Sequence, residues 1–294
     1  MRVLLTGAFG RVGSGIVEHL GPRSEFAFTY LDIDEHEDHD SQGVDVTDYD
    51  ALYEAVEGHD AVIHLAAIPN EAPWGDLLET NLIGTYNAYE AAKQADVDSF
   101  VFASSNHVVG TVQERHAPEL YHPSYDLLLT HDVEPCPKTV YGVTKLFGEG
   151  LGHYYASHEP APTRCYSLRI CGTRYPADDH PWSDAERGVV GGEWDRGSTG
   201  YWEQAAKRMA MGTTSRDFAR AIECCLTDNT VEHTACYVTS DNPASWFDLE
   251  HTRAAIGYEP VDDLSAWDGP VPAGVPRELP AAAPGWLPDY VLPK

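Results

Sequence analysis

The chain has 294 residues, 43% of them hydrophobic, which is enough for one large domain or two modest domains with buried cores. Lysine and arginine number 19 against 47 aspartates and glutamates, so the formal net charge is −28 at pH 7. A field this negative repels nucleic acid phosphates and anionic lipid surfaces. No apolar run reaches the ~18 residues of a membrane helix, and the N-terminal run meets a glycine loop instead of a cleavage site. We expect a cytoplasmic protein that binds neither nucleic acid nor membrane.

The acidic residues are scattered along the chain, and only five of the bases are lysines. Two interpretations stay open: an ordinary acidic enzyme, or a protein of a high-salt cytoplasm in which counterions screen the repulsion. We favour the second. The acidic stretch 32–40 contains His36 and His39, but an exposed loop does not hold ligands convergent, so we expect no metal site. The six cysteines form no CxxC pair and are expected to be reduced.

Short apolar segments alternate with helical patterns over the first 170 residues. Strands are predicted at 2–6, 25–31, 43–46, 61–65, 99–103 and 163–170, and helices at 11–20, 48–57, 75–94 and 140–157. This alternation is typical of βαβ units with right-handed crossovers. The fold class is therefore α/β, a Rossmann-like doubly wound parallel sheet, with a dinucleotide-binding domain over residues 1–170.

Beyond residue 170 the pattern weakens, and we expect a small C-terminal substrate-binding lobe over 171–294. Residues 175–201 are rich in Gly, Asp, Trp and Pro and are expected to be irregular. Helices are predicted at 202–211 and 215–226, and a strand at 235–239. Prolines crowd residues 269–294, which predicts an extended tail on the surface or on a partner subunit of a homo-oligomer.

A glycine loop follows the first strand and opens the first helix. It reads TGxxGxxG over residues 6–13. Gly7 permits the tight turn, Gly10 lets the backbone approach a pyrophosphate, and Gly13 allows close packing of helix on strand. In this context the motif predicts dinucleotide binding.

The second strand ends in a carboxylate, Asp32, which hydrogen-bonds a ribose 2′-hydroxyl and repels a 2′-phosphate. Asp34 and Glu35 add to the repulsion, so the sequence favours NAD and leaves NADP open. Asp45 and Val46 end the third predicted strand, within reach of an adenine ring.

The segment Tyr141–Lys145 reads YxxxK at the start of a helical pattern. Residues four apart share one helix face, so the lysine charge is expected to lower the tyrosine pKa and make Tyr141 a general base. Ser105 lies at the carboxyl end of an apolar strand, where α/β sheets bind ligands. It is placed to hydrogen-bond the reacting oxygen.

The ordered set TGxxGxxG, Asp32, HLAA, Asn81, SSN and YxxxK resembles the extended short-chain dehydrogenase/reductase family over about residues 1–260. The resemblance implies that the catalytic residues are Ser105, Tyr141, Lys145 and Asn81. Motif and resemblance together place these residues at the cofactor: Gly7, Phe9, Gly10, Arg11, Val12, Gly13, Asp32, Asp45, Val46, Leu65, Ala66, Ala67, Tyr141, Lys145, Ile170 and Cys171.

Three segments are similar to uronate dehydrogenases and haloarchaeal sugar dehydrogenases: HLAAIPNEAPW (64–74), NLIGTYNAYEAA (81–92) and FASSNHVVG (102–110). This similarity implies oxidation of C1 of a cyclic aldose, uronate or sugar phosphate to the lactone, with hydride transfer to NAD. Nucleotide-sugar epimerases usually carry VYG where this chain has VVG at 108–110, yet an epimerase stays an alternative. A non-catalytic dinucleotide sensor would not need YxxxK.

The same similarity implies these substrate-binding residues: Asn70, Ser105, Asn106, His107, Tyr141 and Arg208. Alternatives stay open for two of them, a core histidine for His107 and a surface-helix arginine for Arg208. Residues 178–203 look like an insertion relative to uronate dehydrogenases. This segment carries four aromatic residues: Trp182, Trp194, Tyr201 and Trp202. We expect them to form a pocket rim that favours a neutral sugar.

Overall fold

The computed structural model describes residues 1–276, so residues 277–294, most of the predicted tail, lie outside the described residues. Seven parallel strands form one sheet in the order β3-β2-β1-β4-β5-β6-β7. The strands are β1 (Arg2–Thr6), β2 (Ala27–Asp32), β3 (Ser41–Gly43), β4 (Ala61–His64), β5 (Ser99–Ser105), β6 (Arg164–Ile170) and β7 (His233–Val238). The order reverses direction between β1 and β4, which is where a doubly wound sheet opens a crevice.

Ten helices connect or flank the strands in residues 1–276. They are α1 (Gly13–His19), α2 (Tyr49–Val56), α3 (Trp74–Asp76), α4 (Gly84–Gln94), α5 (Gly110–His116), α6 (Val140–His158), α7 (Ser183–Gly191), α8 (Thr199–Met211), α9 (Ser215–Thr227) and α10 (Leu249–Ile256). Short 3₁₀ turns are η2 (Asn106–Val109), η3 (Glu119–Tyr121), η4 (Pro176–Asp178) and η5 (Leu264–Ala266), and η1 (Leu77–Ile83) is π-helical. None of the helices in this range is long and apolar enough to span a membrane.

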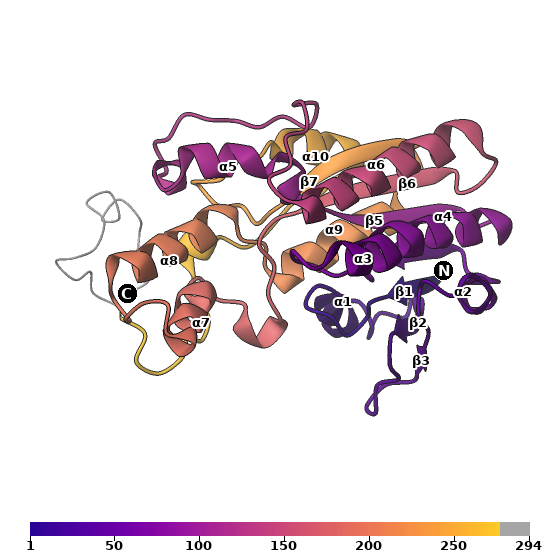
Figure 1. Ribbon diagram of the computed structural model, residues 1–294, viewed down its shortest axis with the longest axis horizontal. Coiled ribbons are helices and arrows are strands. Elements are labelled where there is room, and N and C mark those ends of the chain that lie inside the picture. Colours follow the sequence, from indigo (N-terminus) through magenta and orange to yellow (C-terminus); the bar gives the residue numbers. More distant parts are fainter. Residues whose placement is uncertain (277–294) are drawn as a thin grey trace.

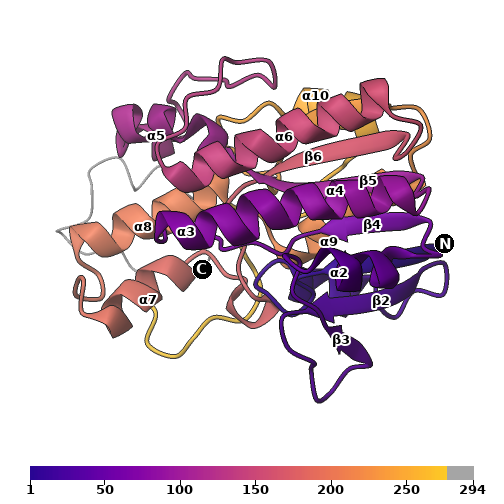
Figure 2. The ribbon, with the colours of Figure 1, turned by 45° about the vertical axis from the view of Figure 1, so that its right-hand side comes forward.

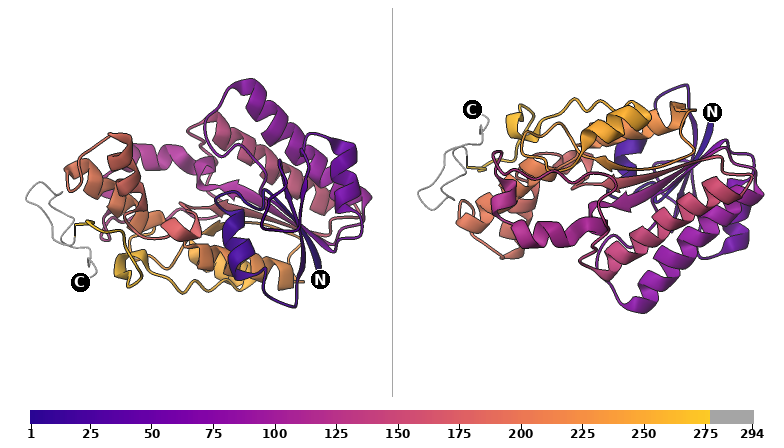
Figure 3. Two further views of the ribbon diagram at one scale, coloured as in Figure 1. Left: turned by 90° about the horizontal axis from the view of Figure 1, so that it is seen from below. Right: turned by 90° about the horizontal axis from the view of Figure 1, so that it is seen from above.

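Helices cover both faces of the sheet (Figure 3). On one face α2, α4 and α6 bury a core that includes Leu52, Tyr89 and Tyr155. Helices α4 and α6 run side by side across this face (Figure 2). On the other face α1, α9 and α10 pack over a core that includes Ile16 and Ile222. The central strands β4, β5 and β6 are almost fully buried, as expected where helices cover both faces of a parallel sheet.

A lobe lies beyond one end of the sheet, where α5, α7 and α8 surround a third apolar core (Figure 1). This core contains Trp182, Trp202, Met209 and Trp246. The chain after Ile170 therefore builds the lobe and then returns to the sheet through α9 and β7. The carboxyl ends of the strands face the lobe, so the crevice lies between the sheet and the lobe.

Most predicted elements are present with ends shifted by a few residues, but the insertion differs from the expectation. Residues 175–201 contain helix α7 and the start of α8. Gly188 is one of the glycines of this segment, whose composition predicted irregular chain. In the fold it lets the Trp194 ring pack on the helix, because a Cβ there would lie 1.9 Å from that ring. The predicted third strand is also displaced, since β3 pairs at Ser41–Gly43.

The predicted aromatic rim is wrong. Trp182, Tyr201 and Trp202 are buried in the core of the lobe. Trp194 packs against the same core, and its indole N–H donates to the Ala185 carbonyl. Because α7 and α8 pack their apolar faces on each other, the aromatic residues stabilise the lobe and leave the cavity wall to other side chains.

Candidate active site

A cavity of about 510 Å³ lies at the carboxyl ends of the strands, between the sheet and the lobe. Most of the sequence-predicted site residues line it. They are Gly7, Gly10, Arg11, Val12, Gly13, Asp32, Val46, Leu65, Ala66, Ala67, Asn70, Ser105, Asn106, His107, Tyr141, Lys145, Ile170 and Arg208. The fold thus brings together motifs separated by up to 200 residues of chain.

Four predicted residues do not line this cavity. Phe9 stacks on the rings of His36 and His39, with centroids 4.3 and 5.2 Å away. Asp45 accepts hydrogen bonds from the backbone and hydroxyl of Thr47. Cys171 is fully buried, and burial raises its thiol pKa. Asn81 lies behind the wall and is described below.

The glycine loop is shaped for close approach of a ligand. Gly7 has φ +67°, and a Cβ there would lie 2.8 Å from the Ala66 nitrogen. A Cβ on Gly13 would lie 2.4 Å from the Gly7 carbonyl oxygen, so only glycine permits this packing of α1. The backbone of Gly10 lines the cavity at the start of that helix. Such a loop presents N–H groups to a pyrophosphate.

The Asp32 carboxylate is held at the far end of the glycine loop. One oxygen accepts from the Phe9 backbone N–H over 2.9 Å, and the other from the Ile33 N–H over 2.9 Å. Two backbone donors fix the orientation of the side chain at the cavity wall. The loop and the carboxylate fit the adenosine side of NAD.

Below the loop, His64 joins β4 to β1 through a 2.9 Å hydrogen bond between its Nδ1 and Thr6 Oγ1. The ring is 1% exposed. Burial, followed by the charge of Lys145, lowers the pKa of His64 to about 3. The imidazole is therefore neutral at pH 7 and serves as an uncharged polar link within the sheet.

Ser105, Tyr141 and Lys145 meet at the cavity, each less than a tenth exposed. Burial raises the Tyr141 pKa, while a hydrogen bond with Ser105 and the charge of Arg11 oppose that rise. The Lys145 ammonium lies 5.7 Å from the Tyr141 ring centroid, and burial lowers the Lys145 pKa to about 7. The expected lowering of the tyrosine pKa by lysine is therefore not the dominant effect here, because both groups are desolvated.

Helix α6, which carries Tyr141 and Lys145, is held in place at its N-terminal end and again further along its length. At its start the Thr139 hydroxyl accepts from the Gly142 N–H, and a Glu71 oxygen accepts from the Tyr141 N–H over 3.0 Å. Glu71 was missed by the sequence analysis, because a contact across 70 residues leaves no local pattern.

Further along, a buried ion pair ties α6 to the sheet. Arg169 on β6 donates through Nε and Nη2 to the two oxygens of Glu149 on α6, each over 2.9 Å. The hydroxyl of Ser104, next to Ser105, donates to Glu149 over 2.6 Å. The pair thus fixes the helix that carries the tyrosine relative to the strand that carries the serine.

Asn81 lies in the π-helical segment η1, and its side chain connects two neighbouring segments by hydrogen bonds. Its Oδ1 accepts from the Ile68 N–H over 2.8 Å, and its Nδ2 donates to the Ile68 carbonyl and to Thr144 Oγ1. It joins the loop after β4 to helix α6. In this structure Asn81 positions the wall of the cavity, which agrees with the frequent occurrence of π-helical turns at functional sites.

Asn106 and His107 extend the site towards the lobe. The His107 backbone N–H donates to Ser105 Oγ, and the His107 ring stands edge-on to the Tyr141 ring at 5.4 Å. The surrounding protein, together with Lys207 and Lys138, lowers the His107 pKa. An accessible, mostly neutral imidazole beside the tyrosine can accept or donate a hydrogen bond to a substrate hydroxyl.

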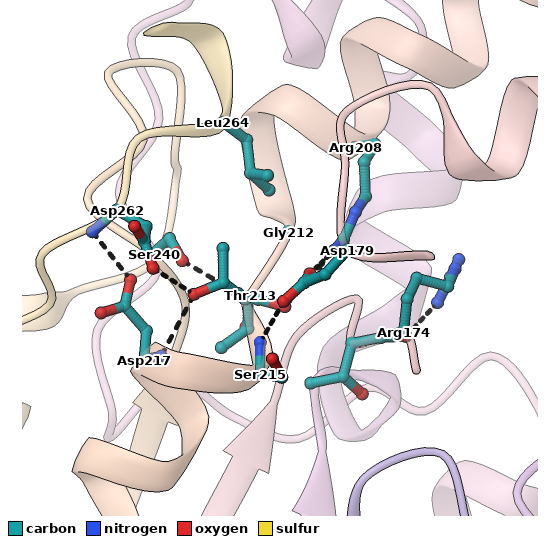
Figure 4. A network of polar contacts seen from close by, with 12 residues as sticks. Arg174, Asp179, Arg208, Gly212, Thr213, Ser215, Asp217, Ser240, Asp262 and Leu264 are labelled. Carbon is teal, nitrogen blue, oxygen red and sulfur yellow. Dashed lines mark hydrogen bonds and ion pairs between the residues drawn. The ribbon is translucent and has the colours of Figure 1, made fainter. Parts of the chain in front are cut away.

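The lobe side of the cavity is lined by charged residues that the sequence analysis did not identify. They are Arg174, Asp184 and Lys207, and they lie beside the predicted Arg208. Arg174 is paired with Asp184, and Arg208 with Asp179. Arg208 is 1% exposed and directed at Asp179 (Figure 4), so it is not the surface-helix arginine of the alternative. It lines the cavity, and its Nε and Nη1 have no hydrogen-bond partner among the described residues, so a substrate-binding role stays a prediction.

Residues 3–176 match the model of the NAD dependent epimerase/dehydratase family. The chain belongs to this family. Among curated relatives, an L-arabinose 1-dehydrogenase (NAD(P)(+)) of Haloferax volcanii is 38% identical over 89% of this chain and 97% of its own length. An NAD-dependent glucose-6-phosphate dehydrogenase of the same organism is 35% identical over 89% of this chain and 93% of its own length.

Solved structures agree with this placement in the family. A mutated uronate dehydrogenase superposes with a TM-score of 0.70 at 28% identity, covering 90% of this chain and 83% of that one. A glucuronic acid dehydrogenase from Chromohalobacter salexigens gives 0.69 at 29% identity, covering 90% and 86%. The predicted Rossmann-like fold and the predicted family are confirmed.

Proposed function

We propose that the protein is an NAD-dependent sugar 1-dehydrogenase that oxidises the C1 hydroxyl of a cyclic aldose or aldose derivative to the lactone. The observation that carries the proposal is the meeting of Ser105, Tyr141 and Lys145 at a cavity that also contains the glycine loop and Asp32. The relatives support this class of enzyme, because they are named as dehydrogenases of an aldose, an aldose phosphate and uronates. Pentose, hexose, uronate and sugar phosphate remain candidate substrates.

In this proposal NAD, when bound, accepts the hydride from C1. The residues of this chain perform the proton chemistry: Tyr141 takes the C1 hydroxyl proton, and Ser105 hydrogen-bonds the same oxygen and orients it. Lys145, whose Nζ lies 5.7 Å from the Tyr141 ring centroid, would hold the nicotinamide ribose. The glycine loop with Arg11 would hold the pyrophosphate, and Ile170 and Ala66 would flank the nicotinamide half of the cofactor.

The experiment is NADH formation by the full chain with a panel of aldoses, uronates and aldose phosphates. The proposal expects NADH in proportion to lactone formed with at least one member of the panel. A nucleotide-sugar epimerase would return NAD unchanged and give no net NADH. That outcome, with epimerised UDP-sugars, would replace the proposal by the epimerase alternative.

The charge of −28 and the shortage of lysine support a further part of the proposal, that the enzyme works in a high-salt cytoplasm. Counterions at molar KCl would screen the repulsion among surface carboxylates. Helicity measured by circular dichroism should rise with KCl concentration. A chain that stays folded and active in dilute buffer would refute this part. A cytoplasmic location, a homo-oligomer and the division of the chain at residue 170 also stay predictions.

A further inference from the structure

The backbone of Tyr141 is held at both its N–H and its carbonyl by groups that lead to the same loop. The Tyr141 N–H donates to a Glu71 carboxylate oxygen over 3.0 Å. The Tyr141 carbonyl accepts from the Thr144 hydroxyl over 2.8 Å, and that hydroxyl accepts in turn from Asn81 Nδ2 over 3.1 Å. Because the Asn81 amide also holds the backbone N–H and carbonyl of Ile68, both routes end in the loop that joins β4 to α3.

This loop, residues 65–73, is the β4 loop, and its first half forms a wall of the cofactor side of the cavity. Residues 65–70 line the cavity together with the glycine loop and Asp32. The β4 loop and the glycine loop are in close contact, since a Cβ on Gly7 would lie 2.8 Å from the Ala66 nitrogen. The β4 loop thus connects the wall against which a dinucleotide would lie to the helix that carries the tyrosine.

The first turn of α6 has two capping acceptors of different origin. The first amides of a helix have no acceptor within the helix itself. The Gly142 N–H is bonded to Thr139, the residue just before α6, whereas the Tyr141 N–H is bonded to Glu71, 70 residues away in sequence. The Thr139 contact moves with the helix. The Glu71 contact exists only while the β4 loop lies over α6, and because Glu71 is exposed it can open without unpacking a core.

The Glu71 carboxylate also acts on the neighbour of the tyrosine. Burial is the main influence on the His107 pKa and lowers it, as do the charges of Lys207 and Lys138, whereas the Glu71 charge opposes that lowering. The His107 ring stands edge-on to the Tyr141 ring at 5.4 Å. Glu71 therefore lies where these two rings meet, and a displaced β4 loop would affect both.

We propose that Glu71 is a positioning residue that couples occupation of the cofactor side of the cavity to the alignment of Tyr141. The inference rests on the proposed function, because Tyr141 is the base of that reaction. NAD lying against residues 65–70 holds the β4 loop over α6, and the Glu71 carboxylate then fixes the Tyr141 backbone. By linkage, the factor by which NAD strengthens this contact is the factor by which the contact strengthens NAD binding. The sugar therefore meets an aligned base in the NAD complex and a less ordered one before NAD binds.

Amide hydrogen exchange at the first turn of α6, followed by NMR, tests this coupling without any sugar. The full-length wild type, Glu71→Ala and the matched control Thr139→Ala are compared with and without saturating NAD at one KCl concentration. In the wild type, NAD should slow exchange of the Tyr141 N–H about fivefold or more, the scale of one helix-capping hydrogen bond. Glu71→Ala should abolish this slowing and leave the Gly142 N–H protected. Thr139→Ala should do the reverse, with faster exchange at Gly142 and the NAD effect on Tyr141 retained.

NAD affinity and turnover give a second, independent readout. The Kd of NAD, measured by fluorescence titration, should rise about fivefold in Glu71→Ala and stay close to the wild-type value in Glu71→Gln, whose amide oxygen still accepts from the Tyr141 N–H. With a sugar that yields NADH, kcat should fall about tenfold or more in Glu71→Ala with little change in KM for the sugar, because a displaced base is costly to catalysis. The loss should be much smaller in Thr139→Ala, although each variant removes one capping acceptor and should lower Tm by a similar amount.

The proposal is overturned if NAD leaves exchange of the Tyr141 N–H unchanged in the wild type. It is also overturned if Glu71→Ala and Thr139→Ala shift NAD affinity and kcat alike, since Glu71 would then be a helix cap only. Failure of the proposed function would look different: no sugar would yield NADH, yet the differences in exchange and NAD affinity between wild type and Glu71→Ala would persist. That result would support Glu71 as the link between cofactor and Tyr141 and reassign the reaction alone.

Discussion

The two sides of the cavity hold their polar groups in different ways. On the nucleotide side, Asp32 is held by two backbone N–H groups and His64 is a neutral ring bonded to Thr6. On the lobe side, Arg208 and Arg174 are each held by a carboxylate from residues 178–191. The nucleotide side thus holds its polar side chains with backbone groups and neutral hydrogen bonds, and the lobe side holds them with pairs of opposite charges. Removing one side chain is therefore expected to be more disruptive on the lobe side, where it leaves a charge without its partner.

The two sides also differ in how far apart their interacting residues lie in the sequence. The glycine loop is complete within eight residues, whereas Asp179 and Arg208 are 29 residues apart and meet only because the chain after η4 lies against α8. Substitutions on the lobe side are expected to have larger effects than substitutions on the nucleotide side.

Removing the carboxylate that pairs with Arg208 should have the largest effect. Asp179→Ala leaves a buried guanidinium without a counter-charge and also removes the acceptor of the Ser215 N–H. Breaking a buried pair in this way costs about 3–5 kcal/mol. The free energy of unfolding, measured with urea at fixed KCl, should fall by that amount.

The matched control is Asp178→Ala, an exposed neighbour that should change stability very little. A double variant, Asp179→Leu with Arg208→Met, should recover much of the loss, because the uncompensated charge is gone. Equal stability of Asp179→Ala and wild type would show that the lobe does not depend on this pair.

The second variant acts at the boundary of the two sides. Tyr141→Phe removes the proposed base and should lower kcat by about two orders of magnitude or more, which corresponds to about 2.7 kcal/mol in the activation barrier. NAD binding, followed by fluorescence titration, should stay close to that of the wild type. Turnover near the wild-type rate would refute the proton-transfer role.

The sequence predicted the nucleotide side because its signals are local. Gly7 and Gly13 are required by turn and packing, and YxxxK places two side chains on one helix face whatever the rest of the chain does. The family resemblance then supplied Asn81 and His107. Glu71 could not be predicted, since its contact with the Tyr141 N–H depends on how the loop after β4 folds over α6.

The lobe side was predicted poorly for a physical reason. Residues 175–201 were expected to be irregular because they are rich in Gly, Asp, Trp and Pro, yet one of these glycines, Gly188, receives the Trp194 ring in a packed helix pair. The aromatic residues were assigned to a sugar-binding rim, whereas burial of Trp182 and Trp202 forms the core of the lobe. Whether an aromatic residue faces a ligand or a core depends on tertiary packing, which one sequence does not show.

The third variant tests the nucleotide side. Asp32→Ala removes hydrogen bonds to the ribose and the repulsion of a 2′-phosphate, so the preference for NAD over NADP should fall by about tenfold or more. The ratio of kcat/KM with the two cofactors measures it. Asp34→Ala, at an exposed position two residues on, is the control and should change the ratio much less. A wild type that prefers NADP would contradict this assignment of Asp32.

The smallest effect concerns the neutral histidine of the nucleotide side. The His64 pKa is about 3 in the folded protein, against 6.5 for a free imidazole. As pH falls through 6.5 the unfolded chain takes up a proton that the folded protein does not, so stability decreases with falling pH between 6.5 and about 3. From pH 7 to pH 6 this single group should cost about 0.7 kcal/mol. His64→Asn keeps a polar side chain next to Thr6 but cannot titrate, so its unfolding free energy should decrease by that much less over the same pH step. Measuring both proteins by urea unfolding at one KCl concentration cancels the contribution of the surface carboxylates. Identical pH slopes would mean that the folded protein protonates His64 over the same pH range as the unfolded chain, and the assignment of a neutral buried imidazole to the nucleotide side would be wrong.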